Sequence, residues 1–229
     1  MIYSLSVCLK SDTSFGRGDG VPGLVDLEIE HDAAGCPEIG GRRLKGLLVE
    51  ERANLEYVLG PARWQTWASV ADELFGRSGA TEAGYAHMHV GTAALPAPLR
   101  AALHAQVQAM ALRRDEVLAA LTTIRRQTAL DARSGAPEHG SLRAVRVLLR
   151  ETQLVAPLEF SAPPSEAALA LLAACVLAMR RGGSGRNRGR GRLQLLLHQA
   201  PPTDLQAPEA AQFTRTCFDH FSRLLREAA

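Results

Sequence analysis

The sequence predicts an α+β protein in which two helices lie on one face of an antiparallel sheet. Three observations support this prediction. Residues 2–9 alternate apolar and polar side chains, which is typical of a half-buried strand. Residues 165–181 are apolar almost all round, as expected of a helix packed flat on a sheet. After residues 2–9, the predicted elements of the core follow in the order helix, one or two strands, strand, helix, strand. The sequence contains no internal repeat of fixed period.

The first half of the chain contains two predicted helices separated by a short strand. Residues 11–23 are rich in glycine and aspartate and form a long loop, and Val25 to Ile29 is a candidate short strand. Apolar residues recur at helical spacing from Arg42, and Gly60-Pro61 is expected to end that helix. His87 to Val90 is a second candidate strand, and residues 97–121 carry the apolar stripe of one further helix.

The second half begins with three predicted strands, the first two joined by a glycine-containing turn. They are Arg125 to Leu130, Arg143 to Leu149 and Gln153 to Phe160. The helix over 165–181 has Ser165 as its N-cap and ends at Gly182-Gly183. A strand from Leu193 to His198 and an amphipathic helix complete the chain.

Composition excludes several classes of protein. The chain has 229 residues, 46% of them hydrophobic, so it can bury a core. Its 26 basic and 24 acidic residues give a net charge of only +2, which excludes a protein that is basic throughout. The longest apolar stretch, Ala167 to Met179, is shorter than the about 20 residues of a membrane span, and no signal peptide is visible. The four cysteines are scattered without a C-x-x-C pair, which favours reduced thiols in a cytoplasmic protein over a disulfide frame or a zinc site.

One segment concentrates positive charge. Arg180 to Arg192 alternates arginine with glycine and contains no acidic residue. Glycine lets backbone N–H groups approach an anion closely, and arginine supplies charge. We interpret this segment as a loop that binds a polyanion, the alternative being a solvated basic loop. The spacings of the P-loop and of the dinucleotide-binding motif are both absent, which argues against an ATPase or a Rossmann enzyme.

A second segment places a carboxylate near predicted phosphate-binding groups. Asp26 follows the glycine-rich loop, and Arg42, Arg43 and Lys45 stand at the start of a predicted helix. Free N–H groups and the helix dipole already favour an anion at that end, and the basic side chains oppose the dipole. An anion bound there would resolve the conflict.

These segments resemble the signature of the RAMP superfamily, and above all the backbone subunits of type III CRISPR–Cas complexes. The resemblance rests on the glycine-rich loop, Val25-Asp26, Asp32, Gly35-x-Pro37 and Arg42-Arg43-Leu44-Lys45-Gly46, followed in order by three further stretches. These are Leu74-Phe75-Gly76, Thr128 to Pro137 and Gly182 to Gly191. Gly40 stands where the family usually has proline, and Arg42-Arg43 where it usually has Ser-Ser, which points to a divergent branch near the type III-D group.

The resemblance implies a single RAMP domain over residues 1–229 with a ferredoxin-like, modified RNA-recognition core. It implies that residues 97–121 are a helical insertion or thumb. It also implies guide RNA, target RNA and other effector subunits as partners, and a cytoplasmic location without a membrane. Asp26 would be the catalytic residue for cutting target RNA, either as ligand to a divalent metal (Mg or Mn) or as acceptor of the hydroxyl proton. The residues implied to bind RNA are Arg42, Arg43, Lys45, Gly182, Gly183, Arg186, Arg188, Gly189 and Arg190.

Three functions therefore stay open at this point. The first is an endoribonuclease subunit that acts within a guide-loaded complex. The second is a non-catalytic subunit of the same fold that only binds guide RNA. The third is a separate ribonuclease that processes precursor guide RNA, a chemistry that often uses histidine as acid or base.

Overall fold

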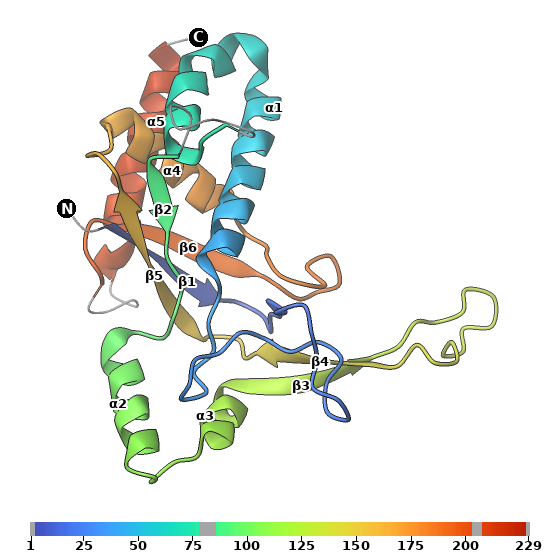
Figure 1. The fold of residues 1–229 in the computed structure, drawn as a ribbon. Coiled ribbons are helices and arrows are strands. Elements are labelled where there is room, and N and C mark those ends of the chain that lie inside the picture. Colours follow the sequence, from blue (N-terminus) through green and yellow to red (C-terminus); the bar gives the residue numbers. More distant parts are fainter. Residues whose placement is uncertain (1–2, 78–85, 203–207, 228–229) are drawn as a thin grey trace.

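Four antiparallel strands form the sheet at the centre of the molecule (Figure 1). A computed structural model describes residues 3–77, 86–202 and 208–227. The strands are β1 (Tyr3–Leu9), β2 (Met88–Val90), β5 (Gln153–Phe160) and β6 (Leu193–His198), in the order β2-β5-β1-β6. With a helix after β1 and another after β5, this is a ferredoxin-like arrangement. The α+β prediction is confirmed.

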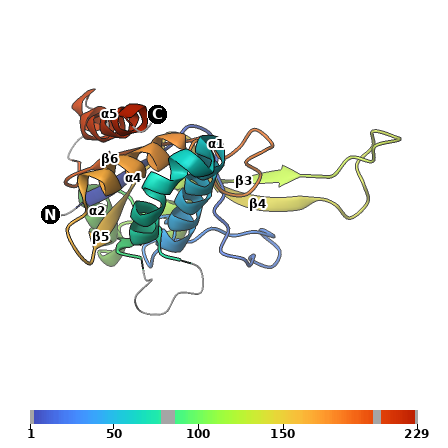
Figure 2. The same cartoon turned by 90° about the horizontal axis from the view of Figure 1, so that it is seen from above.

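Three helices lie on one face of this sheet (Figure 2). They are α1 (Gly41–Phe75), α4 (Glu166–Ala178) and α5 (Gln212–Glu227), the last preceded by the 3₁₀ turn η2 (Pro208–Ala211). The central helix α4 packs against α1, α5 and β6, which explains why it is apolar almost all round. Ser165 caps it as predicted, because its hydroxyl accepts from the Ala168 N–H (3.1 Å).

The central strand β1 is buried on both faces, although its alternation predicts only one buried face. Ser4 and Ser6, on the polar side, are 1% and 6% exposed. The Ser6 hydroxyl lies 2.8 Å from Nε2 of His198, and the Ser4 hydroxyl donates to the Ala200 carbonyl (3.2 Å). Because these polar groups have partners in β6 and just beyond it, they can be buried without a large cost.

The helical segment that begins at Gly41 ends at Gly60-Pro61 as predicted, and a second helical segment that was not predicted follows directly within α1. Gly60 has a left-handed backbone (φ +72°) that kinks the helix, and helical structure resumes and runs to Phe75. Glycine adopts this conformation at little cost, and Pro61 then opens the second segment, where its missing N–H is not needed. Trp64, Trp67 and Leu74 on this second segment are buried in the core.

Everything between β2 and β5 is an insertion into the ferredoxin-like core. It contains α2 (Ala97–Gln108), α3 (Arg114–Leu121), β3 (Thr122–Gln127) and β4 (Arg143–Leu148). The single helix expected over 97–121 is therefore two helices. Met110 takes a left-handed backbone (φ +56°) between them, and the Glu116 carboxylate accepts from the Arg113 N–H (2.7 Å) where α3 begins.

The antiparallel hairpin β3–β4 projects far from the body of the molecule (Figures 1 and 2). The stretch Thr128 to Pro137, which carries part of the family resemblance, lies beyond β3 in the projecting loop. At the base of the hairpin, the Arg146 Nε donates to both oxygens of Glu28 (2.8 and 3.0 Å), and both side chains are buried. This ion pair fastens the hairpin to the loop that carries Asp26.

The four cysteines are free thiols, of which Cys36, Cys175 and Cys217 are buried. Among the described residues, no helix combines the length and the apolar character that a bilayer crossing requires.

Candidate functional site

Two loops that are distant in the sequence lie against each other at the edge of the sheet. The Ser184 N–H donates to the Ser14 carbonyl (2.8 Å), and the Gly191 N–H donates to the Asp12 carbonyl (3.2 Å). Gly183 has φ +80°, and a Cβ there would lie 2.5 Å from the Ser14 carbonyl oxygen. Glycine is therefore required where the arginine-rich loop meets the first loop.

The glycines of the arginine-rich loop have different structural roles. Gly182 is buried, and its N–H donates to the Gly191 carbonyl (2.9 Å), which closes the loop. Gly189 has φ +79°, but a Cβ there would meet nothing within 4 Å. Of the three glycines predicted to bind RNA, Gly182 and Gly183 are thus already needed by the fold, whereas Gly189 is exposed.

Asp26 is held by the backbone of β4. The Ala144 N–H donates to Oδ2 of Asp26 (2.6 Å), and the Asp26 N–H donates to the Ala144 carbonyl (2.8 Å). The neighbouring Arg146 N–H donates to the Leu27 carbonyl (3.0 Å). The segment around Asp26 is therefore paired with β4 through an isolated parallel bridge between Leu27 and Val145, and this sets the direction of the carboxylate.

Asp26 and the arginine-rich loop line one groove of about 540 Å³. Asp26 comes from the first loop, Arg143 from β4, and Arg186, Arg188 and Arg190 from the second loop. Asp26 is the one acidic side chain among the described residues that line this groove, and no histidine is among them. The groove thus has the charge expected of a phosphate site, with a single carboxylate at its wall.

One of these arginines is already neutralised. Arg186 makes two hydrogen bonds of 2.8 Å to the carboxylate of Glu50 on α1. This contact raises the pKa of Arg186 and holds the pKa of Glu50 below its usual value. Arg143, Arg188 and Arg190 form no ion pair with any described residue, so they leave net positive charge in the groove.

The basic residues at the start of α1 do not form one cluster with this loop. Arg42 is exposed, while Arg43 donates to the Phe15 carbonyl (3.2 Å) and pairs with Glu30 (3.3 Å). Lys45 points to β2, where its Nζ donates to the Met88 carbonyl (3.1 Å), and burial lowers its pKa. The anion expected at this helix start is supplied by the protein itself, because Glu30 accepts from the Gly40 N–H (3.1 Å).

Sequence reasoning missed several basic residues beside the groove. A second hollow, of about 640 Å³, shares Arg190 with the first and is also lined by Lys10, Arg125 and Arg150. Arg125 is paired with Asp12 (2.6 Å), which also lines this hollow. Lys10 follows β1 and Arg125 lies on β3, so no local motif in the sequence connects them.

Comparison with solved structures finds the same fold in CRISPR effector complexes. A chain of the type III-B Cmr-beta complex bound to cognate target RNA has a TM-score of 0.59 and 13% identity, covering 86% of this chain and 97% of that chain. A chain of the apo state of the type III-B Cmr-beta complex has a TM-score of 0.58 and 13% identity, with coverages of 88% and 99%. No protein-family model and no curated protein matches the sequence. At this identity the likeness concerns the fold.

Proposed function

We propose that this chain is an RNA-binding backbone subunit of a type III CRISPR effector complex, and that it cuts the target RNA paired with the guide. The observation that carries the proposal is the groove in which Asp26 faces Arg143, Arg186, Arg188 and Arg190. The similarity in fold to chains of the type III-B Cmr-beta complex supports the assignment to such a complex. The proposal includes the assignment of this subunit to a branch near the type III-D group.

The basic residues bind the RNA backbone in this proposal. Arginine forms paired hydrogen bonds with phosphate oxygens, and such contacts position a strand without reading its sequence. The exposed Arg188 and the half-buried Arg190 contribute most, since both lack an ion-pair partner among the described residues. Arg42 and Gly189, which are also exposed, extend the contact surface.

The chemistry assigned to Asp26 is the cleavage of a phosphodiester bond by the neighbouring ribose. The 2′ oxygen attacks phosphorus, the bond from phosphorus to the 5′ oxygen breaks, and the products carry a 2′,3′-cyclic phosphate and a 5′-hydroxyl. Asp26 accepts the proton of the 2′-hydroxyl, and the departing 5′ oxygen takes up a proton from solvent. The groove arginines stabilise the negative charge that develops on the phosphate oxygens.

A divalent metal fits this groove only together with the RNA. Mg²⁺ and Mn²⁺ prefer oxygen ligands, and Asp26 offers one carboxylate among four arginines, so phosphate oxygens would have to complete the ligand set. Such an ion would supply additional stabilisation of phosphate charge. The residue that would hold it is Asp26.

The test is cleavage of labelled target RNA by the assembled, guide-loaded complex. We expect Asp26→Ala to abolish cutting and to leave guide binding intact, whereas Asp19→Ala, an exposed aspartate of the same loop, leaves both intact. A target with a 2′-deoxyribose at the scissile position should also resist cutting. Undiminished cleavage by the Asp26→Ala complex would falsify the catalytic assignment.

The same experiment separates the two alternative functions. A non-catalytic guide-binding subunit would give a complex whose cutting does not depend on this chain. A processing ribonuclease would cut precursor RNA when the isolated chain is mixed with it. The groove offers no histidine among its described lining residues, which favours the target-cutting function over the processing function.

A further inference from the structure

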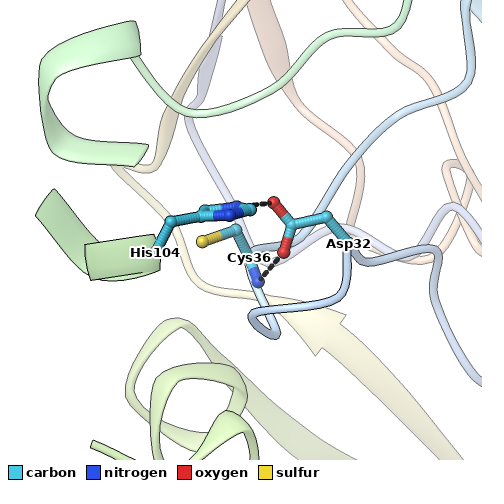
Figure 3. A group of neighbouring side chains, drawn as sticks. All are labelled: Asp32, Cys36 and His104. Atoms are coloured by element: carbon cyan, nitrogen blue, oxygen red, sulfur yellow. Dashed lines mark hydrogen bonds and ion pairs between the residues drawn. The ribbon is translucent and has the colours of Figure 1, made fainter. Parts of the chain in front are cut away.

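A carboxylate, a thiol and an imidazole meet between the first loop and helix α2 (Figure 3). They belong to Asp32, Cys36 and His104, and their candidate ligand atoms all lie within 4.8 Å of one another. Cys36 is fully buried, the side chain of Asp32 is 8% exposed, and that of His104 is 33% exposed. This cluster takes no part in the function proposed above.

The loop presents Asp32 and Cys36 in a fixed geometry. Oδ1 of Asp32 accepts from the N–H groups of Ala34 (2.9 Å) and Cys36 (3.0 Å). Gly35 between them has φ +87°, and a Cβ there would lie 2.3 Å from the Arg114 carbonyl oxygen. The turn is therefore closely packed, and Oδ2 of Asp32 is left to face His104, as Figure 3 shows.

Helix α2 supplies the third group. Nε2 of His104 lies 2.6 Å from Oδ2 of Asp32. His104 also lines a large groove between α2 and the sheet, so solvent reaches the cluster from that side. Carboxylate oxygen, thiolate sulfur and imidazole nitrogen are all ligands of zinc, and three protein ligands plus water are an established zinc coordination.

Arg100 is the cation that competes for this site. Its Nε lies 3.1 Å from Oδ2 of Asp32, and its Nη2 lies 3.3 Å from Oε1 of Glu38. Arg100 therefore has a second carboxylate with which it can stay paired when Oδ2 of Asp32 binds a metal. Without a metal, the same contacts join α2 to the loop by hydrogen bonds and ion pairs.

We propose that Asp32, Cys36 and His104 form a binding site for Zn²⁺ or a similar transition-metal ion, with water as the fourth ligand. Binding replaces the proton of the Cys36 thiol by the metal, so one proton leaves for each ion bound. A bridge from the loop to α2 would then fix the start of the insertion relative to the core. The site is separate from the Asp26 groove, and its test does not use RNA cleavage.

Cobalt reports directly on the ligand set, and the probe is Co²⁺ added to the metal-free full chain. We expect about one ion per chain, with the intense near-ultraviolet absorption of a thiolate bound to cobalt, displaced by an equimolar amount of Zn²⁺. Cys36→Ser should remove the thiolate band, and His104→Gln should weaken binding at least about tenfold, since losing even an outer partner of a metal ligand costs that much. Cys8→Ser and His89→Gln are the matched controls and should bind as the unaltered chain does.

Buried cysteine variants can fail to fold, so each variant is first checked by circular dichroism. His104 is half-exposed, and a folded His104→Gln chain keeps the test decisive even when Cys36→Ser does not fold. Arg100→Gln should tighten binding because it removes a positive charge beside the carboxylate. Absence of stoichiometric binding, a cobalt spectrum without the thiolate band, or equal affinity in folded His104→Gln would overturn the proposal.

Discussion

Asp26 and Ala144 exchange two hydrogen bonds, one between backbone groups and one from the Ala144 N–H to the Asp26 carboxylate. The two residues are 118 positions apart in the sequence. The carboxylate proposed to act on RNA is therefore directed by the hairpin β3–β4 and not by the central sheet. Its orientation depends on a backbone donor that no substitution other than proline removes.

The first prediction separates the structural role of Asp26 from its charge. Asp26→Asn can keep an oxygen that accepts from Ala144, whereas Asp26→Ala loses the hydrogen bond. We expect Asp26→Ala to lower the free energy of unfolding by about 1 kcal/mol and Asp26→Asn to change it by less than half of that. Urea denaturation of the two variants measures both values. Equal losses would mean that the hydrogen bond contributes nothing to stability.

The second prediction concerns the ion pair that neutralises Arg186. Glu50→Gln removes the charge of its partner and leaves Arg186 available to RNA phosphate. We expect tighter binding of single-stranded RNA and an increase of about 0.7 in the slope of log affinity against log salt, the value for one additional phosphate contact. Fluorescence anisotropy at several salt concentrations measures both. The control is Glu56→Gln, which removes the charge from a different ion pair on the same helix, Arg52–Glu56. It should leave the slope unchanged.

The third prediction concerns the buried pair at the base of the hairpin. Glu28 and Arg146 are 2% and 8% exposed, so removing one partner leaves an unpaired buried charge. We expect Glu28→Gln or Arg146→Met to lower the free energy of unfolding by about 3–5 kcal/mol, and the double variant Glu28→Leu/Arg146→Met to lose less than either single variant. The exposed pair Arg125–Asp12 is the control, where Arg125→Ala should lower it by less than about 1 kcal/mol. A double variant less stable than both single variants would contradict this account.

Periodicity and turn residues predicted the core of the fold well. The strands ending at Phe160 and His198 and the cap at Ser165 were confirmed, because each depends on local preference and on a repeating apolar pattern. The helix between them was also predicted, but it ends at Ala178 and not at Gly182-Gly183. The break at Gly60-Pro61 was predicted, but the second helical segment after it was not, since glycine followed by proline ends a helix without showing whether another begins. The outcome depends on whether the following segment finds a core to bury Trp64 and Trp67, which is a tertiary property.

The candidate site also has a part that the sequence predicted and a part that it did not. The sequence placed Asp26 near the arginine-rich loop only through a family resemblance, and the structure puts both on one groove. Arg143 and Glu50 were missed because their neighbours are set by strand pairing and helix packing, not by spacing. His104 and Cys36 were missed for the same reason, and the absence of a C-x-x-C pair argued against zinc although His104 approaches the loop from another element.

The fourth prediction compares two glycines of α1. Gly46 lies in a regular part of the helix and Gly60 has φ +72°, and a Cβ at either position would meet nothing within 4 Å. We expect Gly46→Ala to raise the free energy of unfolding by up to about 1 kcal/mol, because alanine loses less backbone entropy in a helix. Gly60→Ala should lower it by about 1–2 kcal/mol, because its Cβ disfavours the left-handed conformation. Opposite signs in urea denaturation support the kink; the same sign for both would exclude it.

The fifth prediction is a pH dependence that arises from His198. Burial lowers the pKa of His198 in the folded chain, and its Nε2 faces the Ser6 hydroxyl (2.8 Å). Below the ordinary histidine value of about 6.5 the unfolded chain binds a proton that the folded chain resists, so stability falls as the pH falls through this range. We expect the slope of unfolding free energy against pH between about 7.5 and 5 to decrease in His198→Gln.

Urea denaturation across that pH range gives the measurement. His89→Gln, at an exposed position on β2, serves as the control and should keep the slope of the unaltered chain. An identical slope in His198→Gln would show that the buried imidazole does not govern the acid sensitivity.

The two walls of the groove are held by different elements, one by α1 and the other by the hairpin β3–β4. Arg186 is held on α1 through its ion pair with Glu50. Arg143 lies on the hairpin and Asp26 is hydrogen-bonded to it, and the Arg146–Glu28 pair holds the base of the hairpin. A rotation of the hairpin about its base would change the width of the groove without changing any of the charges that line it. An RNA strand that contacts the hairpin would thus set the width of the groove that its own phosphate must enter. The contact with the hairpin would in this way align the phosphate with Asp26.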